Sequence, residues 1–157
     1  IFFSDYAANL GGYSTIPLGK LSPTLHSIVE ESRTWEVSRL VMALRDLEWH
    51  RMMVSKLFKR FDLLVTPTLA TSAFPIGKRP KEINGREVNE YWGFTPFTFP
   101  FNMSGNPAAS VPCGFTEDSL PVGLHIVGRK GEESKVLAAS AVFERLRPWS
   151  SHRPPGY

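Results

Sequence analysis

Residues 98–128, TFPFNMSGNPAASVPCGFTEDSLPVGLHIVG, decide the fold of this chain. Two short apolar runs lie within this stretch, at 108–113 and 121–128, and Gly114 begins the polar turn that links them. Short apolar runs bounded by turn residues are typical of buried strands. Gly123, in the second run, permits close packing against a neighbour. The stretch therefore predicts two neighbouring strands joined by a turn.

The longest periodic segment lies upstream, at residues 34–61, with Thr34 as a candidate N-cap. Its apolar residues recur at three- and four-residue steps, and its charged residues fall largely on the other side. This pattern predicts one amphipathic helix packed on the core. Residues 62–67 follow directly and read as a short strand of the same sheet, ended by a proline. The apolar side of the helix comprises Val37, Leu40, Val41, Leu44, Leu47, Leu57, Phe58 and Phe61.

Shorter elements complete the predicted α/β order. Ser22-Pro23 marks a helix start, with serine as N-cap and proline at the first helical position. Asn84-Gly85 predicts a two-residue hairpin turn of type I′. Residues 91–101 are rich in aromatic residues and proline and are too irregular to assign. Glu132-Glu133 opens a last helix that ends at Pro148, because acidic side chains suit the positive end of the helix dipole. Its apolar stripe comprises Val136, Ala139, Ser140, Phe143 and Leu146.

Composition limits the class of protein. The chain has 157 residues, of which 42% are hydrophobic and 21% charged, enough for one packed domain or part of a larger one. Its net charge is +3 and its basic residues are scattered, which argues against nucleic-acid binding. No apolar run reaches the ~18 residues of a membrane span. Cys113 is the only cysteine, so an intrachain disulfide is excluded. The chain begins at Ile1 without a signal-peptide pattern, and we read it as a possible fragment.

Cys113 and His125 are the one thiol–imidazole combination in the sequence, and Asp118 lies between them. A thiolate nucleophile needs a base within hydrogen-bond reach and a third group that orients the base. If the two strands pair as a hairpin, however, Cys113 faces the start of the second strand, away from His125. We therefore favour a buried structural thiol and a strand histidine. The other histidines show no ligand-like spacing and no phosphate-loop pattern occurs, so neither a metal nor a cofactor is expected.

Four motifs follow one another along the chain. They are DLLVTPT at 62–68, TFPFNMSGNPAASVPCGF at 98–115, LPVGLHIVG at 120–128 and Phe143-Glu144 in the last helix. In this order they resemble the C-terminal third of the amidase signature enzymes, over residues 40–154. The resemblance implies an α/β fold, namely the C-terminal part of an α/β/α sandwich with a mixed β-sheet. It also implies that residues 1–157 are the C-terminal portion of a single amidase domain whose catalytic N-terminal part is missing.

The resemblance further implies hydrolysis of a carboxamide, through an acyl-enzyme, to a carboxylate and ammonia or an amine. The family uses a serine nucleophile, a second serine in a cis peptide, and a lysine that must be neutral, and therefore desolvated, to activate the serine. Backbone N–H groups of a glycine- and serine-rich loop form the family's oxyanion hole. This chain has no such loop, and Lys20 and Lys56 do not match the lysine. We expect no catalytic residue in it and no activity from the chain alone.

The partners that the resemblance implies are the N-terminal part of the same enzyme and a small amide substrate, with no nucleic acid and no membrane. A homodimer is compatible with it, and the family is commonly cytoplasmic. Two alternatives stay open. One is a non-catalytic binding or scaffold module derived from an amidase, and the other is a tRNA amidotransferase A-type subunit.

Two positions depart from the family pattern. His125 stands where the family often has glutamine. The A-type amidotransferase subunits carry an acidic residue seven positions before the motif asparagine, and the residue here is the uncharged Thr95. Its aromatic neighbours favour an apolar or aromatic acyl group and an ordinary amidase, although core packing explains these aromatic residues equally well. The substrate-binding residues expected from this segment are Tyr91, Trp92, Thr95, Phe97, Thr98 and Asn102.

Overall fold

The computed structural model describes residues 20, 22–32 and 34–152. The chain divides into two compact units between His50 and Arg51, and each unit is described by itself. Among the described residues, no helix combines the length and the apolar character needed to cross a membrane.

The first unit contains helix α2 (Pro23–Ser32) and most of helix α3 (Val37–Leu57). Helix α2 begins as predicted, because the Leu25 N–H donates to the Ser22 hydroxyl at 3.4 Å and Ser22 is thus the N-cap. The prediction that Thr34 caps α3 is wrong. Its hydroxyl instead donates to the Glu31 carbonyl at 2.7 Å, so Thr34 closes the end of α2.

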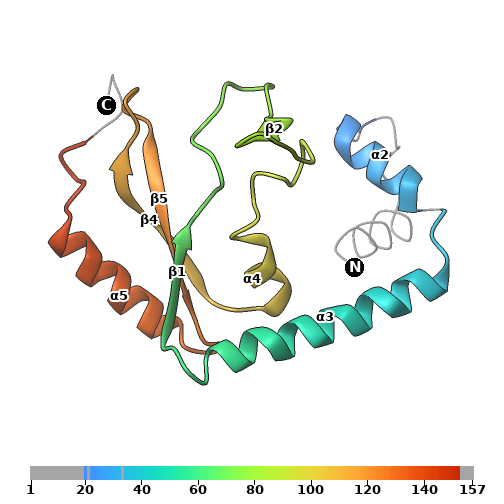
Figure 1. Cartoon of the computed structure of the whole chain (residues 1–157), viewed down its shortest axis with the longest axis horizontal. Coiled ribbons are helices and arrows are strands. Elements are labelled where there is room, and N and C mark those ends of the chain that lie inside the picture. The colour runs from blue at the N-terminus through green and yellow to red at the C-terminus, as the bar shows by residue number, and fades with distance from the viewer. Residues whose placement is uncertain (1–19, 21, 33, 153–157) are drawn as a thin grey trace. The chain divides into compact units, whose positions relative to one another are not determined.

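The second unit is built on a three-stranded sheet (Figure 1). Its strands are β1 (Leu63–Pro67), β5 (Pro121–Gly128) and β4 (Ala108–Phe115), in this spatial order. Both pairings are antiparallel, and His125 lies opposite Thr66 on one side and Ser110 on the other. The structure thus confirms that the three predicted strands share one sheet in an α/β fold.

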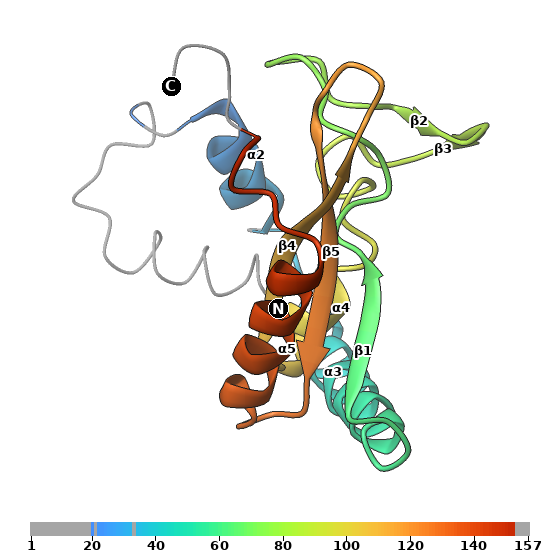
Figure 2. The ribbon, with the colours of Figure 1, turned by 90° about the vertical axis from the view of Figure 1, so that its left-hand side faces the viewer.

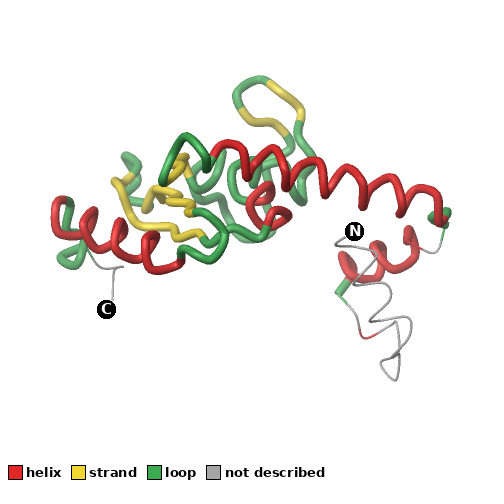
Figure 3. Tube along the Cα trace, turned by 90° about the horizontal axis from the view of Figure 1, so that it is seen from below, coloured by secondary structure: helices red, strands yellow, loops and turns green. Residues whose placement is uncertain are grey.

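Helices cover both faces of this sheet (Figure 2). Helix α5 (Glu133–Leu146) packs on one face, where Val136 joins a buried cluster with Ile126. Gly128 allows this close approach, because a Cβ atom there would lie 2.6 Å from Cγ2 of Val136. The end of α3 lies on the other side of the strands, as Figure 3 shows, where Phe58 packs against Val127. The sheet is therefore the middle layer of the unit.

The predicted core side of the long helix is only partly correct. Phe58 is buried, as is Val54, which the periodicity did not single out. A helix of 21 residues is about 30 Å long, and a cluster on a three-stranded sheet occupies only one end of it. The exposed members of the predicted set are Val37, Leu40, Val41, Leu44, Leu57 and Phe61.

The hairpin and the aromatic segment form as separate local structures. Strands β2 (Glu82–Ile83) and β3 (Arg86–Glu87) flank Asn84 and Gly85, whose positive φ angles of 51° and 73° confirm the predicted type I′ turn. The aromatic segment, left unassigned above, ends in helix α4 (Phe99–Ser104).

Local sequence explains the bounds of α4 and α5. Pro100 lies in the first turn of α4, and Gly105 ends this helix with a left-handed φ of 72°. Helix α5 ends before Pro148, as predicted. Leu146, however, is 74% exposed, so its place in the apolar stripe is wrong: it lies in the last turn, beyond the cluster that Val136, Ala139 and Phe143 form on the sheet.

Candidate functional site

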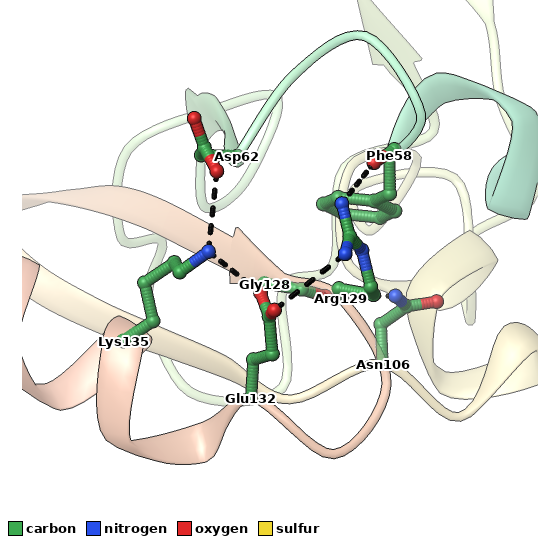
Figure 4. Close-up of polar contacts among 7 residues, drawn as sticks. All are labelled: Phe58, Asp62, Asn106, Gly128, Arg129, Glu132 and Lys135. Atoms are coloured by element: carbon green, nitrogen blue, oxygen red, sulfur yellow. Dashed lines mark hydrogen bonds and ion pairs between the residues drawn. The ribbon is translucent and has the colours of Figure 1, made fainter.

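A polar cluster lies where the end of α3 meets β1, β5 and α5 (Figure 4). Lys135 Nζ is 3.0 Å from a carboxylate oxygen of Glu132 and 3.2 Å from one of Asp62. Hydrogen bonds to Glu132 and Asp62 raise the pKa of Lys135 above its ordinary value. A lysine that acts as a base needs a lowered pKa. Lys135 is therefore a charged structural residue and no substitute for the catalytic lysine of the family.

The same cluster joins the helices to the sheet through backbone carbonyls. The Arg129 guanidinium donates to the Phe58 carbonyl, and Asn106 Nδ2 donates to the Gly128 carbonyl at 2.8 Å. The buried Ser104 hydroxyl donates in turn to Asn106 Oδ1 at 2.6 Å. These contacts stabilise the fold and contain no nucleophile beside a base. No sequence pattern predicted these contacts, although Asn106 lies inside the motif at 98–115.

The predicted substrate-binding residues lie in one folded segment, which is held by local hydrogen bonds. The side chain of Asn89 accepts the N–H groups of Tyr91 and Trp92 at 2.9 and 3.1 Å. The Thr95 hydroxyl donates to the Trp92 carbonyl at 2.8 Å, and the Thr98 hydroxyl donates to the Thr95 carbonyl at 3.4 Å. The hydroxyls of Thr95 and Thr98 thus each bond a backbone carbonyl three residues earlier in the same segment.

Two aromatic contacts involve residues of this segment. The Arg79 guanidinium lies over the Tyr91 ring at 4.7 Å, and the rings of Trp92 and Phe99 are 5.5 Å apart. Phe97 is half-buried, and Asn102 lies in α4 with an exposed side chain. The six residues are therefore brought together as one surface segment.

A groove of about 400 Å³ opens next to this segment, at the ends of β1 and β5. The N–H of Ala70, in its wall, donates to the carbonyl of Phe94 at 3.1 Å, which joins the groove to the aromatic segment. None of the six predicted residues lines it. It is lined by Thr68, Leu69, Ala70, Thr71, Ser72, Ala73, Ser110, Pro112, Pro121, Val122 and Gly123, and we call it the β1–β5 groove.

His125 is 4% exposed and lies in the middle of the sheet. Its Nδ1 is 3.3 Å from the Thr66 hydroxyl oxygen, and its ring packs against Phe101 with centroids 5.7 Å apart. Burial lowers the pKa of His125 below its ordinary value, because desolvation disfavours the charged imidazolium. This confirms the interpretation of His125 as a strand histidine.

Cys113 lies away from His125, which agrees with the predicted hairpin. A β-bulge lies between Pro112 and Gly114, and the Cys113 thiol donates to the Val122 carbonyl at 3.4 Å. The prediction that this thiol is buried is wrong: Cys113 is exposed, because the bulge takes it out of the regular pairing. Within the described part of the chain, no three His, Cys, Asp or Glu side chains gather as a metal site would require.

Replacing His125 with glutamine tests the burial of the imidazole. Because the folded pKa lies below the unfolded value of 6.5, the unfolded chain binds more protons below that pH. Burial of the neutral imidazole costs no stability well above pH 6.5, and the free energy of unfolding decreases as the pH falls from 6.5 through the lower folded pKa. We expect His125→Gln, which can still bond Thr66, to reduce the loss of stability between pH 7.5 and 5.5, measured by urea unfolding. Equal losses in the two proteins would contradict a depressed pKa.

The fold and the order of the motifs define the class of this protein. Three of the motifs supply the strands of the antiparallel sheet, and Phe143-Glu144 lies in helix α5. The family model described as Amidase matches residues 18–137, and the chain belongs to the amidase family. Among curated proteins, an acylamidase of Rhodococcus erythropolis is 43% identical over 95 residues, 60% of this chain and 20% of its own length. The A-type subunit of the glutamyl-tRNA(Gln) amidotransferase of Synechococcus sp. (strain JA-2-3B'a(2-13)) is 40% identical over 100 residues, 64% of this chain and 18% of its own length.

Solved structures agree with this family. A bacterial aryl acylamidase of the amidase signature family superposes with a TM-score of 0.79 at 29% identity, over 98% of this chain and 36% of its own. A 6-aminohexanoate cyclic dimer hydrolase shares the fold with a TM-score of 0.83 at 24% identity, over 98% of this chain and 34% of its own. The chain thus spans about a fifth of the curated relatives it matches and about a third of these structures.

Proposed function

We propose that residues 1–157 are the C-terminal portion of a single amidase domain, in an enzyme that hydrolyses carboxamide C–N bonds to a carboxylate and ammonia or an amine. The observation that carries this proposal is the coverage: 98% of the chain superposes on 36% of an aryl acylamidase. The catalytic serine, cis-serine and lysine of the proposed enzyme belong to its N-terminal part, which is the first partner of this chain. A small amide is the second, with no nucleic acid, no membrane and a cytoplasmic location; a homodimer of the complete enzyme is compatible with the proposal.

The polar contacts support the absence of a catalytic centre in this chain. The hydroxyl of Ser104 is buried and bonded to Asn106, and the thiol of Cys113 has the Val122 carbonyl as its partner. Neither contact supplies the base that a serine or cysteine nucleophile needs. The role of this portion is to supply sheet, covering helix and one wall of the substrate site.

The isolated chain will not hydrolyse acetanilide, whereas the complete enzyme will release aniline from it. Without the serine–serine–lysine set, the nucleophile and its base are missing, and the chain offers only positioning groups. Aniline release by the two proteins at equal concentration is the measurement. Turnover by the isolated chain that disappears in Cys113→Ala or Ser104→Ala would show that the nucleophile lies here.

We propose further that Tyr91, Trp92, Thr95, Phe97, Thr98 and Asn102 contact the acyl part of an apolar or aromatic amide. The aromatic contacts of the segment and its link to the β1–β5 groove support this assignment. An A-type amidotransferase chain is the second candidate, favoured by the 40% identity to one such protein. The uncharged Thr95 argues against it, because a substrate amino group needs a carboxylate there.

Thr95→Asp in the complete enzyme tests the segment. A carboxylate at this half-buried position lacks a cationic partner on an aryl amide, so we expect kcat/KM for acetanilide to fall about tenfold or more. The loss for acetamide will be smaller, because a small polar amide does not fill an apolar wall. Thr95→Ser keeps the hydroxyl bonded to Trp92 and is the matched control. Equal losses for both amides, or none, would place the acyl site elsewhere.

A further inference from the structure

Two hydroxyl groups meet in the wall of the β1–β5 groove. Thr68 follows directly after β1, Ser110 lies in β4, and their side-chain oxygens are 2.7 Å apart. The Thr68 N–H donates to the Gly123 carbonyl at 2.9 Å, which fixes Thr68 beside β5. The hydroxyl pair therefore spans the whole width of the three-stranded sheet, since β5 is the central strand.

Gly123 makes this meeting sterically possible. A Cβ atom at Gly123 would lie 2.5 Å from the Thr68 hydroxyl oxygen and 2.6 Å from that of Ser110. Any side chain at this position would push the two hydroxyls apart. Glycine inside a strand often marks a place where another group approaches closely, and here those groups are the two hydroxyls.

The hydroxyl pair can form further hydrogen bonds. Each hydroxyl carries one hydrogen and two lone pairs, and the bond between them uses one hydrogen and one lone pair. One O–H remains to donate, and lone pairs remain to accept. A primary carboxamide offers the complement of this pair, because its carbonyl oxygen, which accepts, and the N–H syn to that oxygen, which donates, lie on the same edge of the group.

The remaining lining selects against charge. No lining residue of the groove, all of them within the described chain, is acidic or basic. Leu69, Pro121 and Val122 are exposed and present apolar surface beside the hydroxyl pair. A carboxylate or an ammonium group would be desolvated there without a partner, whereas a neutral amide with an apolar substituent loses little. A volume of about 400 Å³ is within the range of small-molecule sites.

We infer that the β1–β5 groove is an amide-binding subsite, in which Thr68 and Ser110 bind the primary carboxamide of a neutral amide and Leu69 and Val122 contact its apolar substituent. The choice of an amide as the ligand class rests on the proposed function. The hydroxyl pair, the close approach at Gly123 and the uncharged lining are observed independently of that function. The subsite is separate from the segment at 91–102, which lines none of the groove.

The test is a titration of the ¹⁵N-labelled chain with benzamide and with methyl benzoate, followed by the backbone amide resonances. The two probes share the phenyl ring and the carbonyl, and methyl benzoate replaces the amide NH₂ with an ester methoxy group. We expect the largest shifts at Leu69, Ser110 and Gly123. One hydrogen bond is worth about a threefold to tenfold difference in affinity, in favour of benzamide. Shifts confined to other regions, or equal affinity for the two probes, would overturn the subsite.

Two variants test the hydroxyl pair itself. Gly123→Ala separates the hydroxyls without removing either, and Thr68→Val with Ser110→Ala removes both. Each is expected to abolish the preference for benzamide, and the double variant decides if Gly123→Ala does not fold. Ser140→Ala is the control, because this hydroxyl bonds the Val136 carbonyl within α5. An unchanged preference in the double variant would overturn the proposal.

The titration and the hydrolysis assay fail independently. If benzamide binds the groove and the complete enzyme cleaves neither benzamide nor acetanilide, the proposed activity is wrong and the subsite stands. If the complete enzyme cleaves these amides and the groove does not bind benzamide, the subsite is wrong and the activity stands.

Discussion

Phe58→Ala will lower the free energy of unfolding of this chain by about 3–5 kcal/mol, the usual cost of removing a buried phenyl ring. Phe58 is 2% exposed and packs with Val54 and Val127, so its removal leaves a cavity between the end of α3 and the sheet. The backbone carbonyl of Phe58, which accepts the Arg129 guanidinium, is unchanged by the substitution. The effect therefore reports the loss of packing alone.

Phe61→Ala is the matched control for this experiment. Phe61 lies three residues further along the chain and is 47% exposed, so its truncation should cost less than about 1 kcal/mol. Urea unfolding of the wild-type chain and both variants gives the comparison. Similar losses at the two positions would contradict the burial of Phe58 against the sheet.

Periodicity could not distinguish these two phenylalanines. Both fall on the apolar side of the predicted helix at 34–61, and only the meeting of that helix with Val127 makes one of them core. Strands were easier to predict, because β1, β4 and β5 are short apolar runs between turn residues, and β4 and β5 pair as a hairpin. The Asn84-Gly85 turn was predictable from the two residues alone, since few others adopt positive φ.

The groove was beyond prediction for a different reason. Its walls come from residues 68–73, Ser110, Pro112 and residues 121–123, which three strands bring together. Thr68 and Ser110 are 42 positions apart, and no spacing rule relates them. The exposure of Cys113 depends likewise on a bulge, which inserts one unpaired residue and leaves no clear trace in an apolar run.

The polar cluster of Figure 4 and the hydroxyl pair of the groove use similar chemistry for different ends. The Asn106 amide forms its hydrogen bonds within the protein: it accepts from the Ser104 hydroxyl and donates to the Gly128 carbonyl. Thr68 and Ser110 form a hydrogen bond with each other, and one O–H group and several lone pairs remain for a ligand. The first arrangement fixes the fold, and removing it should affect stability. The second leaves capacity for a ligand, and removing it should affect binding.

Asn106→Ala will therefore destabilise the chain by about 2 kcal/mol, roughly 1 kcal/mol for each hydrogen bond that the side chain makes. The buried Ser104 hydroxyl and the Gly128 carbonyl both lose a partner. Asn106→Asp separates the two contributions, because a carboxylate can still accept from Ser104 but cannot donate to Gly128. We expect its loss to be at least half that of alanine at pH 7.

Asn102→Ala is the control for Asn106, since it makes the same change four residues earlier at an exposed position of α4. Alanine favours a helix more than asparagine does, so this variant should be neutral or slightly stabilised. Urea unfolding at pH 7 compares the three variants with the wild-type chain. If Asn106→Ala were as neutral as Asn102→Ala, the hydrogen bond from Asn106 to the end of β5 would contribute nothing to stability. The α4–β4 turn would then be held by backbone contacts, such as the Gly128 N–H that donates to the Pro107 carbonyl at 2.9 Å.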